Sequence, residues 1–276
     1  MNYCLTAFPE IDRQLRSAKR ILLATDFDGT LCPIADDPSG VHVAPGMGAI
    51  LRQAVECPRL MLAVISGRAL ADVRRRLAFD ITIAGNHGLE ISGGGLSFEH
   101  SGARQLRPRL AEACEASARI LRAWPTAWVE DKGLSATLHF RKVDQRQHHA
   151  LLFTARQALG PFGAQLALRV GNRALEVRPK VQWDKGNALQ YIQKEAGPFN
   201  ACVCIGDDQT DETMFRANSG QLNIRIGRQR PTAASHYLSN PAEVAILISH
   251  IVDTCSSEAH PLWNRPESAA LAVGCD

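Results

Sequence analysis

The sequence of 276 residues predicts an α/β fold in which a parallel sheet with crossover helices is interrupted by a smaller α+β unit. Three observations predict it. From residue 20 to about residue 88, continuous apolar runs alternate with helical periodicity, as in strands buried on both faces. Paired strand patterns dominate residues 124–179, and the first pattern returns after Pro179. The smaller unit is therefore inserted into the larger one.

The first stretch supplies three strands and two helices. The apolar runs "ILLATD", "RLMLAVISG" and "ITIAGNHG" predict buried strands, and "GMGAILRQAVE" and "ALADVRRRLA" predict the helices between them. The segment "LEISGGGLSFEH" predicts a hairpin that turns at residues 93–95.

The middle stretch reads as two helices and two hairpins. A helix with Pro108 near its start is expected to run to about Ala123, and a second helix covers about residues 144–160. The first hairpin joins "WVEDK" to "LSATLHFRKV", and the second joins "LALRV" to "ALEVRP" through Gly171 and Asn172. Apolar and polar residues alternate in "LSATLHFR", which predicts a half-exposed sheet with one polar face.

After Pro179 the sequence returns to helix and buried strand. It predicts a helix at "KGNALQYIQKEAG", strands at "ACVCIGDD" and "LNIRIG", a helix from about Asp211, and a last helix over residues 241–254. We therefore expect a core from residues 1–104 and 181–276 and an inserted domain at residues 105–180. The first 20 residues and the tail from residue 260 receive no assignment.

Composition excludes several classes of function. The net charge of +3 and the absence of a long basic run with interleaved aromatic residues argue against nucleic-acid binding. No window reaches the roughly 18 apolar residues of a membrane helix, and the first residues lack a secretory pattern. The eight cysteines have no paired metal-binding spacing. We expect a reduced, soluble, cytoplasmic monomer without nucleic-acid or membrane partners.

Two aspartates, Asp26 and Asp28, follow the first predicted strand in "LLATDFDGTL". Ligands of open parallel sheets bind beyond the carboxyl ends of the strands, so both carboxylates lie where a site is expected. The alternative is that they only cap a helix. A neighbouring strand ends in Ser66 and Gly67, which could contact the same ligand.

A third strand ends in the acidic segment "GDDQTDE", which contains Asp207, Asp208 and Asp211. Because so many carboxylates at one edge repel one another, we expect a cation among them. Oxygen ligands favour Mg²⁺. Asp26 could then attack a phosphoryl group as a nucleophile, and Asp28 could act as general acid and base. Balancing the phosphoryl charge requires donors, and Lys185 is one candidate, with Ser66 and the Gly67 amide as others.

These four segments, "DFDGTL", "SGR", "KG" and "GDDQTD", resemble the motifs of the haloacid dehalogenase superfamily of aspartate-nucleophile phosphatases. The resemblance implies a Rossmann-like core with an inserted cap of the C2B type. It also implies that Asp26 forms an aspartyl-phosphate and Asp28 is the general acid and base. Asp26, the backbone oxygen of Asp28 and Asp207 would bind Mg²⁺, with Asp211 assisting at the same site.

Three further segments, "GNHGLE", "VEDKGLSATLHFR" and "LEVRP", are similar to those of trehalose-6-phosphate phosphatases. The resemblance spans about residues 20–230 and implies trehalose 6-phosphate as substrate. The residues that it implies for the sugar pocket, together with Gly67 beside the phosphate, are Asn86, His87, Glu130, Lys132 and Glu176. Glu130 and Lys132 point to one face of a strand, where one accepts and the other donates hydrogen bonds.

Simpler interpretations stay open. Glu130 and Lys132 could be solvated strand residues, His87 a buried junction histidine, and Arg178 an anchor of the hinge, while Asp208 and Arg141 have no assigned role. Trp124, Trp128 and Trp183 are expected in the core more than as sugar platforms, although Trp128 shares a strand face with Glu130. Competing functions are a phosphatase of sucrose phosphate or mannosylglycerate phosphate, a mutase, and a sugar-phosphate sensor without turnover.

Overall fold

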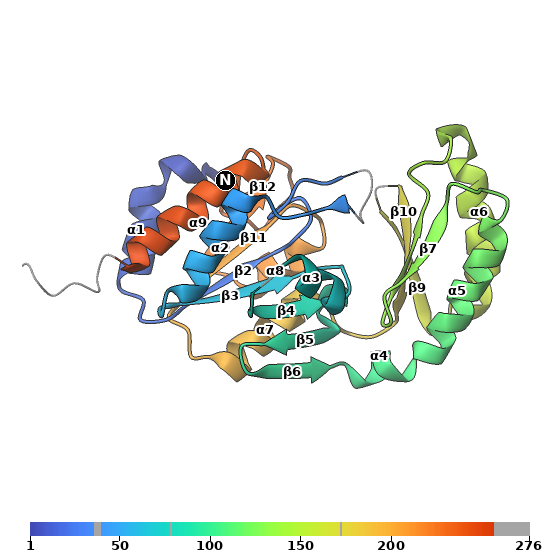
Figure 1. Cartoon of the computed structure of the whole chain (residues 1–276), viewed down its shortest axis with the longest axis horizontal. Helices are drawn as coiled ribbons and strands as arrows, with labels where there is room; N and C mark the ends of the chain where they lie inside the picture. Colours follow the sequence, from blue (N-terminus) through green and yellow to red (C-terminus); the bar gives the residue numbers. More distant parts are fainter. Residues whose placement is uncertain (36–39, 78, 172, 257–276) are drawn as a thin grey trace, which may run out of the picture.

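A computed structural model describes residues 1–35, 40–77, 79–171 and 173–256 (Figure 1). Its larger sheet has nine strands, of which the first six neighbouring pairs are parallel and the last two are antiparallel. In spatial order the strands are β1 (Asn2–Tyr3), β13 (His236–Leu238), β12 (Leu222–Ile226), β11 (Ala201–Gly206), β2 (Ile21–Thr25), β3 (Leu60–Ile65), β4 (Thr82–Gly85), β5 (Glu90–Gly93) and β6 (Leu96–Glu99).

Helices cover both faces of this sheet because successive strand residues point to opposite sides. Ile21 and Leu23 of β2 pack in one apolar cluster, and Leu22 and Ala24 pack in another. The helices on the first face are α1 (Phe8–Arg16), α2 (Pro45–Glu56), α3 (Leu70–Arg76) and α9 (Pro241–Ser256). Those on the second face are α7 (Lys185–Ala196) and α8 (Asp211–Ala217). This is the predicted buried parallel sheet with crossover helices.

The second sheet has four antiparallel strands and is built from the chain between β6 and α7. In spatial order they are β7 (Trp128–Asp131), β8 (Ala136–His139), β10 (Ala174–Pro179) and β9 (Leu166–Gly171). The helices α5 (Arg107–Leu121) and α6 (His148–Leu159) pack on its apolar face, and α4 (Ser101–Gln105) leads into α5. Figure 1 shows α5 and α6 on the side away from the nine-stranded sheet.

The polar face of the second sheet differs from the expectation of half-exposure. Ser135 and Thr137 are buried, and Thr137, His139 and Arg141 line a cavity shared with the first sheet. The polar alternation is real, but this face turns toward the ends of β2 and β11 instead of bulk solvent. A period-two pattern cannot distinguish water from a polar cavity.

Other differences lie at the edges. The first 20 residues add β1 beside β13 and pack α1 against α9, although two-residue and three-residue strands leave no periodic signal. Asn172 of the predicted hairpin turn and the tail from residue 260 lie outside the described residues. The domain boundaries at residues 104 and 180 stay a prediction. Within the described chain, no helix is both long enough and apolar enough to span a bilayer.

The centre of the nine-stranded sheet supports a stability prediction. Leu23 is fully buried in β2 between β11 and β3. We expect Leu23→Ala to lower the free energy of unfolding by about 2–5 kcal/mol, because it removes apolar contacts and leaves a cavity. Urea unfolding would measure it. Ile246→Ala on α9, where the side chain is 51% exposed, is the control, and an equal loss in both variants would contradict the layer assignment.

Candidate active site

A fully enclosed lysine joins three elements at the carboxyl edge of the nine-stranded sheet. Lys185, the first residue of α7, places its Nζ 2.6 Å from Oδ1 of Asp26 and 2.7 Å from Oδ1 of Asp211. Asp26 follows β2, and Asp211 opens α8. All three side chains are buried. Burial acts to lower the pKa of Lys185, but the two carboxylates outweigh it and raise this pKa above its ordinary value.

Asp211 also fixes the loop after β11. Its Oδ2 accepts hydrogen bonds from the backbone N–H groups of Asp207 and Asp208, each at 2.9 Å. Both oxygens of Asp211 therefore have protein donors, an arrangement that suits positioning of the loop more than direct metal binding. A Cβ at Gly206 would lie 2.4 Å from Cγ of Asp211, so only glycine fits beside it.

Glycine is also required where the first motif passes the acidic loop. Gly29 has a φ of +77°, and a Cβ there would lie 2.2 Å from Oδ2 of Asp207. The glycine of "DFDGTL" therefore allows the chain after β2 to approach the chain after β11. The close approach brings Asp207 toward Asp26.

The carboxylates of Asp26, Asp207 and Asp211 form a group that could hold a metal ion, with their ligand atoms within 4.8 Å of one another. Burial raises the pKa of Asp26 well above its ordinary value, Lys185 opposes this, and Asp211 and Asp207 add to it. Burial and the charge of Asp211 raise the pKa of Asp207 to about 7. One lysine does not neutralise three carboxylates, so a hard divalent cation with oxygen ligands fits the group.

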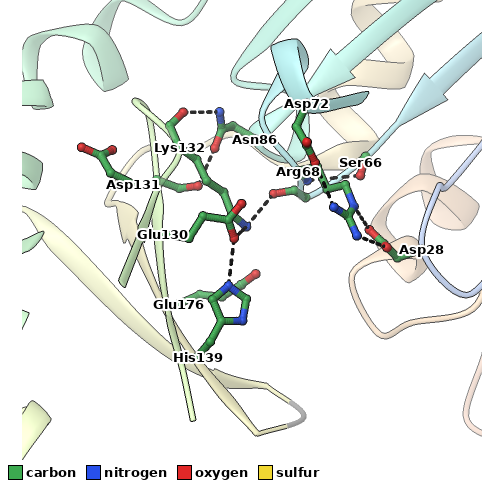
Figure 2. Close-up of polar contacts among 12 residues, drawn as sticks. Asp28, Ser66, Arg68, Asp72, Asn86, Glu130, Asp131, Lys132, His139 and Glu176 are labelled. Carbon is green, nitrogen blue, oxygen red and sulfur yellow. Dashed lines mark hydrogen bonds and ion pairs between the residues drawn. The ribbon is translucent and has the colours of Figure 1, made fainter. Parts of the chain in front are cut away.

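Asp28 is not a member of that group and is held by a residue that the sequence did not single out. The Arg68 guanidinium donates from Nε to Oδ2 of Asp28 at 2.6 Å and from Nη2 to Oδ1 at 2.7 Å (Figure 2). Nη1 of Arg68 donates to Asp72 at 2.8 Å. Such a bidentate pair fixes the orientation of the carboxyl group. Arg68 directly follows Ser66 and Gly67 in "SGR". Its position next to two candidate site residues is the feature of the sequence that could have identified it.

Ser66 and Gly67 lie at the end of β3 but differ in access. Gly67 lines the cavity, whereas Ser66 is fully buried behind it and its Oγ accepts from the N–H of Arg68 at 3.1 Å. A Cβ at Gly67 would lie 2.6 Å from Cε1 of His87. The imidazole of His87 can therefore lie this close to the end of β3 only because residue 67 has no side chain.

Asn86 connects the two sheets directly. Its Nδ2 donates to Oε1 of Glu90 at 2.7 Å and to the carbonyl oxygen of Lys132 at 3.1 Å, and its Oδ1 accepts from Ser135 (Figure 2). Asn86 and His87 both have left-handed backbone, with φ of 50° and 58°. Such conformations cost of order 1–3 kcal/mol each and cluster at functional sites.

His87 meets the second sheet through Glu176. Its Nε2 lies 3.5 Å from Oε1 of Glu176, while Nδ1 is buried without a protein partner. Burial and the charge of Arg178 lower the pKa of His87 to about 3, so the imidazole is neutral at physiological pH. Burial acts to raise the pKa of Glu176, but His87 and Arg178, which donates to Glu176, lower it overall.

Glu130 and Lys132 are oriented by partners and not by solvent. Nζ of Lys132 donates to the carbonyl oxygen of Gly67 at 3.1 Å and lies 3.9 Å from Oε2 of Glu130, which also contacts Nε2 of His139 at 2.8 Å (Figure 2). Burial acts to raise the pKa of Glu130, but His139 and Lys132 lower it overall. Glu130 therefore presents an ionised acceptor to the cavity.

These groups share one cavity of about 700 Å³ between the two sheets. The predicted residues that line it are Asp26, Asp28, Gly67, His87, Glu130, Lys132, Glu176, Lys185 and Asp207, joined by Asp208, Arg141 and Arg178. Asn86 and Asp211 contact this wall from behind through the hydrogen bonds above. The expectation that Trp128 lies in the core is wrong: its side chain is 43% exposed and lines the cavity. Trp124 and Trp183 are partly buried against apolar clusters.

Residues 24–241 match the model of the trehalose-phosphatase family. The chain belongs to this family. It is 31% identical over 279 residues to probable trehalose-phosphate phosphatase 4 of Oryza sativa subsp. japonica, covering 96% of this chain and 72% of that protein.

Solved structures place this family member in the haloacid dehalogenase-like fold. A trehalose-6-phosphate phosphatase related protein superposes with a TM-score of 0.76 at 22% identity, covering 86% of this chain and 99% of that one. A haloacid dehalogenase-like hydrolase from Bacteroides thetaiotaomicron gives 0.59 at 18% identity, covering 84% and 100%. The predicted fold class and family are confirmed.

Contact between Gly67 and His87 gives a prediction for this enzyme. Gly67→Ala forces the imidazole or β3 to move by about 1 Å, and such misplacement near reacting groups costs up to about 100-fold in rate. Initial rates of phosphate release would measure it. Gly48→Ala on α2, where an added Cβ meets nothing within 4 Å, is the control; unchanged rates in both variants would contradict the tight fit.

Proposed function

We propose that this chain hydrolyses trehalose 6-phosphate to trehalose and phosphate with Mg²⁺ as cofactor. The observation that carries the proposal is the position of Asp26 in the cavity, where it forms an ion pair with Lys185. Glu130, Lys132 and Glu176 of the four-stranded sheet line the same cavity. A phosphoryl-accepting carboxylate and a wall of hydroxyl-binding groups match the two halves of a sugar phosphate. Family membership narrows the sugar to trehalose.

In the proposed reaction, a carboxylate oxygen of Asp26 attacks phosphorus and the bond from phosphorus to the sugar O6 breaks. Asp28 protonates that leaving oxygen. Asp28 then removes a proton from the water that attacks the aspartyl-phosphate, which releases phosphate and restores Asp26. Asp26, Asp207 and the backbone oxygen of Asp28 are the proposed Mg²⁺ ligands. When bound, the ion screens the negative charge of the phosphoryl oxygens.

Hydrogen-bond donors of the chain also stabilise the negative charge on the phosphoryl oxygens. We assign Lys185 and the Gly67 amide to the phosphoryl oxygens, since Lys185 touches the nucleophile and Gly67 lines the cavity. Ser66 stays a prediction for this role, and its contact with the Arg68 N–H supports holding that loop. Asp211 positions Lys185 and the backbone of Asp207.

Arg68 is assigned as a positioning residue for Asp28. The bidentate pair orients the Asp28 carboxyl group beside the cavity. Arg68 thereby sets the position from which Asp28 transfers protons in both halves of the reaction.

The inserted unit is proposed to act as a cap that excludes water and selects the sugar. Its contacts with the core include those from Lys132 to the carbonyl of Gly67, from Asn86 to the carbonyl of Lys132, and from His87 to Glu176. Residues 105–180 are its proposed extent. Phosphatases of sucrose phosphate and mannosylglycerate phosphate would use the same chemistry with another cap surface. A mutase would isomerise without releasing phosphate.

The chemistry is tested by Asp26→Asn. We expect phosphate release from trehalose 6-phosphate to require Mg²⁺, to stop with chelator, and to be lost in this variant, because an amide is a poor nucleophile. Asp253→Asn on α9, away from the cavity-lining set, is the matched control. Wild-type activity in Asp26→Asn would contradict the mechanism. Binding of the sugar phosphate by the wild-type protein without turnover would favour the sensor.

Sugar selection is tested by Glu130→Gln and Glu176→Gln. Each loses a charged acceptor for sugar hydroxyls, and we expect kcat/KM on trehalose 6-phosphate to fall by about tenfold to 100-fold. A panel with sucrose 6-phosphate, glucose 6-phosphate and mannosylglycerate phosphate measures selectivity. Glu115→Gln, on the outer helix α5, serves as control. Strong wild-type preference for another sugar phosphate would overturn the substrate but keep the catalytic assignment.

A further inference from the structure

Strand register arranges the polar face of the four-stranded sheet in rows. Glu130 is opposite Thr137, Thr137 is opposite Glu176, and Glu176 is opposite Arg169, which makes one row across the sheet. Two residues further from the Lys132 turn, Trp128 is opposite His139, and His139 is opposite Ala174. Side chains on one face of a strand repeat at about 6.8 Å, so this second row lies one step farther from the core.

The outer row places an aromatic pair in the lining of the cavity. The rings of Trp128 and His139 stack with centroids 4.2 Å apart and planes inclined by 20°. His139 is in turn held by Glu130 at 2.8 Å. The imidazole thus has its orientation set by the carboxylate that faces the sugar, and it supports the indole from one side.

Trp128 exposes a large aromatic surface within the cavity. The indole is 43% exposed, and the lining around it combines charged residues such as Glu130 with apolar residues such as Val170. Its row continues with the small residues Ala174 and Gly171, which also line the cavity and leave room beside the aromatic pair. A large apolar surface with space beside it, inside a cavity, favours a ligand with an apolar face.

We propose that the Trp128 and His139 pair is the platform for the pyranose ring that does not carry the phosphate. This inference rests on the proposed function and deepens it by assigning the second ring of the disaccharide. A pyranose has an apolar face of C–H groups that packs on an indole, while its rim hydroxyls reach acceptors such as Glu130. The phosphorylated ring occupies the inner row, between Asp26 and the outer platform.

The platform makes substrate length a determinant of rate. A monosaccharide phosphate fills the phosphate site and the inner row and does not reach Trp128. A disaccharide phosphate gains the stacking contact. Trp128 therefore selects for the second ring, whereas Glu130 and Glu176 recognise hydroxyl groups nearer the core.

The test compares Trp128→Ala, Trp128→Phe and the control Phe153→Ala, whose side chain is 59% exposed on α6. Steady-state rates on trehalose 6-phosphate give kcat/KM, and trehalose and inorganic phosphate are each assayed as inhibitors. We expect Trp128→Ala to lower kcat/KM and to weaken inhibition by trehalose, each by about tenfold, with inhibition by phosphate unchanged. We expect Trp128→Phe to keep most of the wild-type kcat/KM and of the inhibition by trehalose, because an aromatic ring remains.

Equal inhibition constants for trehalose in Trp128→Ala and the wild type would overturn the platform, as would a parallel loss of phosphate inhibition, which indicates a structural role. A wild-type protein without activity on trehalose 6-phosphate contradicts the proposed function instead. Calorimetric titration of trehalose into the wild type and Trp128→Ala then decides the platform alone: about tenfold weaker binding in the variant supports it, and equal binding rejects it.

Discussion

The ion pairs of Lys185 with Asp26 and Asp211 are the constraint on which the rest of the site depends. They join the end of β2, the start of α7 and the start of α8 in a fully buried position. Removing one partner of such a buried network leaves an uncompensated charge, which costs about 3–5 kcal/mol. The network therefore holds Asp26, the proposed nucleophile, and, through Asp211, the backbone of the acidic loop in one geometry.

Lys185 also lies close in sequence to the end of the inserted unit. Lys185 follows directly after the return from the four-stranded sheet, so the chain leaves Glu176 and Arg178 in β10 and reaches the catalytic edge within a few residues. Asn86 and Lys132 tie the other side of that sheet to β3 and β4. The inserted unit is thus joined to the nine-stranded sheet by short connections at both sides of the cavity.

The catalytic edge could be predicted from sequence because each motif is local and the strand ends of a parallel sheet converge. Asp26 and Asp207 needed only that rule. Lys185, which opens α7, was a candidate because the phosphoryl charge requires a donor. The pairing of Arg68 with Asp28 could not be predicted, because it joins residues 40 positions apart through side chains that no period specifies. The exposure of Trp128 was missed for a similar reason, since an alternating strand does not reveal whether its polar face meets water or a cavity.

In the proposed reaction, Asp26 is the nucleophile of a trehalose 6-phosphate hydrolase. Rapid acid quench of the turning-over enzyme, followed by borohydride reduction and peptide mass spectrometry, tests this role most directly. An aspartyl-phosphate is reduced to homoserine, whereas a free carboxylate is not. We expect homoserine at residue 26, dependent on substrate and Mg²⁺. Measurable turnover with unmodified Asp26 at every quench time would contradict it.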